Sequence, residues 1–136
     1  YFAEAPATLV GRQDAAWAPV LTRAEVEEGL RLERCVGIVH RPQPPETLTR
    51  VREIALSLDD FALAGLAFAV PLYGSAVLSI AVLRGWMGGD EAFDLSRVDE
   101  AFQEEQWGVD AEAAERVARL RVEAQMLDRW FRGLAV

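Results

Sequence analysis

The longest uncharged stretch of this chain, residues 61–83, constrains the fold more than any other feature of the sequence. It runs for 23 residues, which is long enough for one α-helix to cross a lipid bilayer. Its interior favours another structure, because Pro71 and Gly74 interrupt the helical pattern and Ser75 can cap a new helix. The sequence therefore predicts two short buried helices here and no membrane span.

Helix signals follow one another along the rest of the chain. Capping residues, prolines and glycines delimit five further helices, over residues 8–17, 22–32, 46–58, 90–108 and 110–132. We expect Pro19 to separate the first two, because proline removes a backbone donor from a helix interior. Residues 32–39 are rich in β-branched side chains and also fit a short strand. The predicted fold is mainly α, a compact bundle of about six or seven helices in one domain over residues 1–136.

The last of these helices has the clearest periodicity. Its apolar residues recur in steps of three and four, at Ala113, Val117, Leu120, Ala124, Leu127, Phe131 and Leu134. This spacing predicts one inward stripe along the whole helix.

The basic residues exclude several kinds of chemistry. All 14 are arginine, so the chain has no lysine for a Walker-type phosphate loop or a Schiff base. One histidine, His40, and one cysteine, Cys35, provide neither a His-rich metal site nor an internal disulfide. The net charge of −8 and the lack of a basic cluster argue against nucleic-acid binding. We expect no metal and no cofactor.

Negative charge is concentrated in one segment, Asp90 to Glu115. It holds ten carboxylates and a single arginine, Arg97, for a net charge of −9 against −8 for the whole chain. A local field of one sign steers partners of the opposite charge. The segment therefore predicts a binding surface.

Read as one helix at about 100° per residue, the acidic segment has two faces. The face expected to meet the core carries Leu95, Val98 and Phe102. The second face, roughly 140° away, carries Phe93, Glu100, Glu104 and Trp107. A partner with basic groups and an apolar pocket would fit this second face. Alternatively, its aromatic residues pack on neighbouring helices and its carboxylates are simply solvated.

Paired carboxylates also allow an enzymatic interpretation. Glu100 and Glu104 could act as acid and base, in a small helical enzyme or a ligand-binding module. The signal has low specificity, because so acidic a helix contains such pairs by chance.

Four stretches of the sequence resemble a known family. They are Arg12-Gln13 with Trp17, Pro19 and Leu21; Leu58 to Phe61 with Leu63 and Leu66; Gly74-Ser75 with Leu78, Ile80 and Leu83; and Ser96 to Gly108. The family is that of the ATP-twelve assembly factors, which chaperone the α subunit of the ATP synthase catalytic head. The last stretch is the most specific, because helical periodicity alone does not explain its combination of an acid pair, Phe-Gln and Trp-Gly.

The resemblance implies a non-enzymatic chaperone that holds the unassembled α subunit until the β subunit replaces it. It implies that Asp99, Glu100, Gln103 and Trp107 contact this partner, whereas Glu104 matches the family motif less closely. It further implies a β-rich part upstream of Tyr1, so that this chain corresponds mainly to the helical part. We expect a monomer in the cytoplasm of a bacterium, with the mitochondrial matrix as the alternative.

Overall fold

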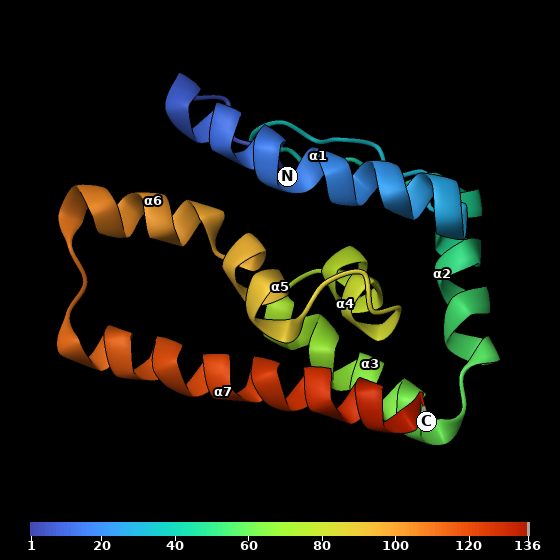
Figure 1. Cartoon of the computed structure of the whole chain (residues 1–136). Helices are drawn as coiled ribbons and strands as arrows, with labels where there is room; N and C mark the ends of the chain where they lie inside the picture. The colour runs from blue at the N-terminus through green and yellow to red at the C-terminus, as the bar shows by residue number, and fades with distance from the viewer. Residues whose placement is uncertain (136) are drawn as a thin grey trace. The chain divides into compact units, whose positions relative to one another are not determined.

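A computed structural model describes residues 1–135 of the chain. The chain divides into two compact units, Tyr1–Ser57 and Leu58–Val136. Seven helices occur in the described residues: α1 (Ala7–Glu28), α2 (Pro45–Ser57), α3 (Asp60–Tyr73), α4 (Ala76–Leu83), α5 (Gly89–Ser96), α6 (Val98–Trp107) and α7 (Ala111–Leu134) (Figure 1). The mainly α fold class is therefore confirmed, whereas the prediction of a single domain stays a prediction.

In the first unit, α1 continues through Pro19. The predicted break between residues 17 and 22 is wrong. Proline costs a helix one backbone hydrogen bond, but residues on both sides of it, Gln13, Val20 and Ala24, are buried along the same helix. Burial of this face favours continuation of the helix over the local preference of proline to end it.

The short strand considered for residues 32–39 is reduced to a single bridge. Val36 pairs in parallel with Phe2, through bonds from the Phe2 amide to the Cys35 carbonyl (2.7 Å) and from the Gly37 amide to the Phe2 carbonyl (2.9 Å). Gly37 then turns the chain away with a φ of +75°, which ends the pairing.

Arg50 of α2 fastens that helix to the end of α1. Its Nε donates to the Glu28 carbonyl at 2.6 Å, and its Nη2 lies 3.5 Å from a carboxylate oxygen of Glu28. Gly29, with a φ of +69°, ends α1 immediately afterwards. The guanidinium of Arg50 thus contacts both the buried carboxylate and the backbone carbonyl of Glu28.

In the second unit, the uncharged stretch forms α3 and α4, as predicted. Asp59 caps α3 by accepting from the Ala62 amide at 2.8 Å, and Ser75 caps α4 by accepting from the Leu78 amide at 3.1 Å. The break lies at Gly74, and Pro71 is inside α3. None of the helices in residues 1–135 combines the length and the apolar character that a membrane span requires.

Burial differs between the two apolar helices. Residues 78–82 of α4 are all buried, as expected. Only one side of α3 is buried, with Gly65, Leu66, Ala69 and Tyr73, while Phe61 and Phe68 are exposed. The prediction of a buried helix is therefore wrong for the other side of α3.

The second unit packs around α7. The inward stripe is buried at Ala124, Leu127 and Phe131, half-buried in the first half of the helix, and exposed at Leu134. The close approach of α5 depends on Gly89, where a Cβ atom would lie 2.0 Å from the Ala124 carbonyl oxygen. This packing fixes α5 and, through it, the start of the acidic surface.

Candidate partner-binding surface

The acidic segment folds as two helices, α5 and α6, that meet at Arg97. The Ser96 hydroxyl donates to the Phe93 carbonyl at 2.7 Å, and the Arg97 amide donates to the Asp94 carbonyl at 3.1 Å. These local bonds compete with helix continuation, and Arg97 takes φ −118° and ψ 22°. The predicted single helix over residues 90–108 is therefore wrong, and Gly88, not Asp90, occupies the N-cap of α5.

The break changes the faces that were expected from a single helix. Phe93 is only 1% exposed, so the prediction that it shares an outward face with Trp107 is wrong. The expected core residues Leu95, Val98 and Phe102 are only half-buried. Angular positions assigned at about 100° per residue are valid only within one helix, whereas residues 90–108 form two helices.

Three predicted contact residues remain on one exposed face of α6. Glu100, Gln103 and Trp107 are exposed, and their spacing of three and four residues aligns them along the helix. Trp107 is 88% exposed, which is unusual for so large an apolar side chain. We call these three residues the α6 stripe.

The other two predicted contacts on α6 are less accessible. Asp99 and Glu104 are both half-buried. Glu104 accepts a hydrogen bond from Arg97 Nη2 at 2.7 Å, so its charge is already paired within the protein. The structure thus brings the predicted residues of α6 onto one helix but does not leave them equally available.

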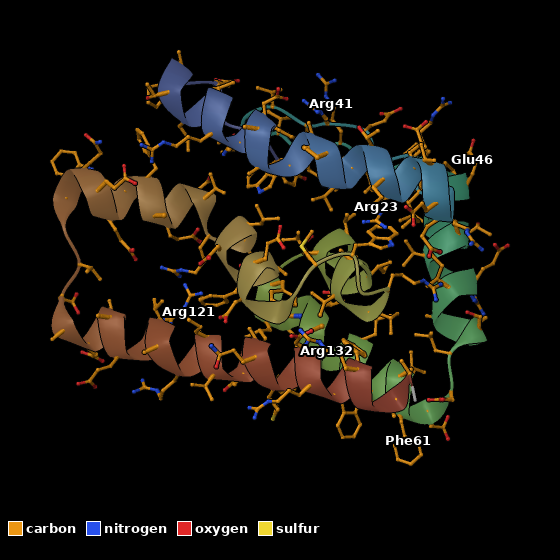
Figure 2. The ribbon with its side chains drawn as sticks, in the orientation of Figure 1. Arg23, Arg41, Glu46, Phe61, Arg121 and Arg132 are labelled. Atoms are coloured by element: carbon orange, nitrogen blue, oxygen red, sulfur yellow. The ribbon has the colours of Figure 1, made fainter. Side chains whose placement is uncertain are left out.

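Arg121 pairs with two further carboxylates of the segment. It reaches from α7 toward α5 (Figure 2), where its Nη2 lies 2.6 Å from Asp94 and its Nη1 lies 3.3 Å from Asp90. The hydrogen bond to Asp94 is the main cause that raises the pKa of Arg121. Arg97 and Arg121 both lie over the ring of Phe93, with Cζ to centroid distances of 5.8 and 4.9 Å. Asp90 and Asp94 of α5 thus serve the α5–α7 contact, and sequence spacing gave no signal for it.

No group of three or more histidine, cysteine, aspartate or glutamate side chains within residues 1–135 is arranged to hold a metal ion. The fold and the surface together define the class: an all-helical protein with an acidic surface helix that ends in an exposed tryptophan.

Comparisons with known proteins identify the family. The chain is 37% identical to Atp12 from Paracoccus denitrificans, with a TM-score of 0.93 over 97% of this chain and 57% of that one. A candidate chaperone from Agrobacterium tumefaciens matches with 36% identity and a TM-score of 0.82, over 96% of this chain and 49% of that one. Over 103 residues the chain is also 27% identical to the mitochondrial protein Atp12 of Schizosaccharomyces pombe, covering 74% of this chain and 35% of that protein.

The chain is homologous to the Atp12 proteins, and the family resemblance expected from the sequence is confirmed. It spans about half the length of the solved relatives and about a third of the yeast relative. No family model matches the sequence.

Proposed function

We propose that this chain acts in ATP synthase assembly, as a chaperone that binds the unassembled α subunit of the catalytic head. The observation that carries the proposal is the α6 stripe, an exposed tryptophan on an acidic helix, in a homologue of Atp12. On this proposal the chain acts by binding alone and catalyses no reaction. The α subunit would be released when the β subunit takes its place.

Capture of the α subunit would use two kinds of contact. Glu100, together with the half-buried Asp99, meets basic groups of the α subunit, and this charge mainly sets the rate of encounter. Trp107 covers apolar surface that the β subunit later buries, and Gln103 hydrogen-bonds beside it. Aromatic anchors of this kind carry a large share of interface energy.

The enzymatic alternative has less support. It needs Glu100 and Glu104 to act together, but Glu104 is bonded to Arg97 while Glu100 faces solvent. The two carboxylates therefore do not share one enclosed site.

The expected location also stays a proposal. Solved relatives come from bacteria, and another relative is mitochondrial. We place this chain in a bacterial cytoplasm and expect it to be monomeric.

Two substitutions in the α6 stripe test the proposal. Trp107→Ala should leave the free energy of unfolding within about 0.5 kcal/mol of the parent, because the ring is 88% exposed. It should weaken binding to the isolated α subunit by roughly thirtyfold, as expected for an interface anchor. Glu100→Arg should slow association and flatten its salt dependence.

Binding is measured by titration against the isolated α and β subunits separately, and protection by light scattering of the α subunit on warming. Glu115→Arg is the matched control, since it makes the same charge reversal on an exposed residue of α7. If both stripe variants protect the α subunit as well as the parent does, the stripe is not the contact. If the chain binds the isolated β subunit more tightly than the α subunit, the α subunit is not its partner and the proposal is wrong.

A further inference from the structure

Arg97 links the two acidic helices through a single side chain. It is at once the C-cap residue of α5 and the N-cap residue of α6. Its side chain is only 20% exposed, with the guanidinium carbon 5.8 Å from the ring centre of Phe93 and Nη2 2.7 Å from Glu104. One end of α6 is thereby tied to a fully buried ring of α5.

The pair reaches far along α6. Arg97 and Glu104 are seven residues apart, which is nearly two helical turns, or about 10 Å. Seven residues also return to nearly the same side of a helix, so the arginine side chain lies along α6 beside the stripe. The carboxylate that it holds is one turn from Trp107.

Apolar packing within the second unit orients α6 less than it orients the other helices, because Val98 and Phe102 are only half-buried. No residue of α6 is buried, and the extensive helix packing of this unit joins α3, α4, α5 and α7. Polar contacts at the end of such a helix therefore have more influence on its direction than they would in a packed core.

We propose that Arg97 is a positioning residue, which holds α6 at the angle that presents the α6 stripe to its partner. The identity of the partner rests on the proposed function, whereas the positioning role rests on the contacts of Arg97 with Phe93 and Glu104. Without Arg97, α6 samples other directions, and only the correctly oriented fraction of molecules binds. Preorganisation of this kind increases affinity without adding a contact.

Simple electrostatics predicts the opposite result. Removing one positive charge makes the surface more negative and exposes Glu104 for pairing, so a basic partner would bind faster and more tightly. The sign of the change in affinity therefore separates positioning from charge.

The experiment compares the full chain with Arg97→Gln, Glu104→Gln, the double variant, and Arg119→Gln as control. Arg119→Gln removes the same charge from a well-exposed residue of α7. We expect Arg97→Gln and Glu104→Gln each to weaken binding to the α subunit by about five- to tenfold, with no further loss in the double variant. The control should stay within about twofold.

Tighter or unchanged binding by Arg97→Gln overturns the inference. The inference is also overturned if the two single variants lose affinity independently, so that their losses add in the double variant. Additive losses would mean that Glu104 contacts the partner directly.

A second measurement needs no partner. Amide hydrogen exchange across residues 101–107 should be about fivefold faster in Arg97→Gln and Glu104→Gln, and unchanged in the control. Unchanged exchange in both variants overturns the positioning role, whatever the partner is. Faster exchange in a chain that binds no ATP synthase subunit supports the positioning role, and only the proposed function fails.

Discussion

Gly89 offers the sharpest test of how the second unit is packed. A Cβ atom at this position would lie 2.0 Å from the Ala124 carbonyl oxygen and 2.8 Å from the carbonyl carbon. Both are backbone atoms in the middle of α7, so no side-chain rotation relieves the contact. The two helices must move apart by about 1 Å before the added methyl group reaches the closest contact that real structures show.

The cost follows from this separation. Overpacking typically costs about 1–3 kcal/mol, and a gap of this size also forfeits a quarter to a half of each dispersion contact across α5 and α7. The preference of alanine over glycine in a helix returns at most about 1 kcal/mol. Gly89→Ala should therefore lower the free energy of unfolding by about 3 kcal/mol, and Tm by roughly 10 °C.

Two other glycines of this unit provide matched controls, because each receives the same methyl group. At Gly65 the new atom meets the rings of Phe131 at 2.6 Å and Trp130 at 2.9 Å, which can move, so we expect a loss of about 1 kcal/mol. At Gly133 nothing lies within 4 Å, so the substitution should be neutral or stabilising by about 0.5 kcal/mol.

Urea unfolding followed by circular dichroism and tryptophan fluorescence measures all three variants. If the two units unfold separately, the change should appear only in the transition of the second unit. A Gly89→Ala protein as stable as the Gly133→Ala protein would refute the close approach of α5 to α7.

Two further predictions concern single polar groups. Burial raises the pKa of Tyr73 to about 12, helped by Asp128 and Asp90, so the unfolded chain loses this proton near pH 10 while the folded chain keeps it. Stability should fall by roughly 2 kcal/mol as pH rises from 10 to 12, and urea titrations at several pH values should show a flatter profile for Tyr73→Phe. Arg50→Gln should destabilise the first unit by about 1–2 kcal/mol because it removes the charged contacts of Arg50 with the Glu28 carbonyl and with the buried Glu28 carboxylate, whereas Arg52→Gln, on an exposed residue of the same helix, should change thermal unfolding little.

Local chemistry made much of the fold predictable. The Asp59, Ser75 and Asp110 caps are each formed by a side-chain oxygen and an amide three residues ahead, so their signal lies wholly within the sequence. The effect of Pro19 was not predictable in this way, because its local preference is overridden by the burial of Gln13, Val20 and Ala24 along the same helix. A proline rule that considers only the backbone cannot weigh that burial.

The candidate site was predictable in part. The alignment of Glu100, Gln103 and Trp107 needs only helical spacing within α6, and the structure keeps all three exposed on it. The break at Arg97 separates Phe93, which is buried in α5, from the exposed face of α6, and beside this break the Ser96 hydroxyl donates to the Phe93 carbonyl of its own helix. Serine in a helical pattern gives too weak a signal for such a break to be expected.

Counting charges along the segment could not show which carboxylates are available to a partner. The net of −9 over residues 90–115 leaves out Arg121, which pairs with Asp90 and Asp94 from 31 and 27 residues away. It also treats Glu104 like its neighbours, although Arg97 holds it across two turns of helix. The negative field is therefore weaker at α5 than the sequence implies, and it is concentrated on α6, beside the exposed tryptophan.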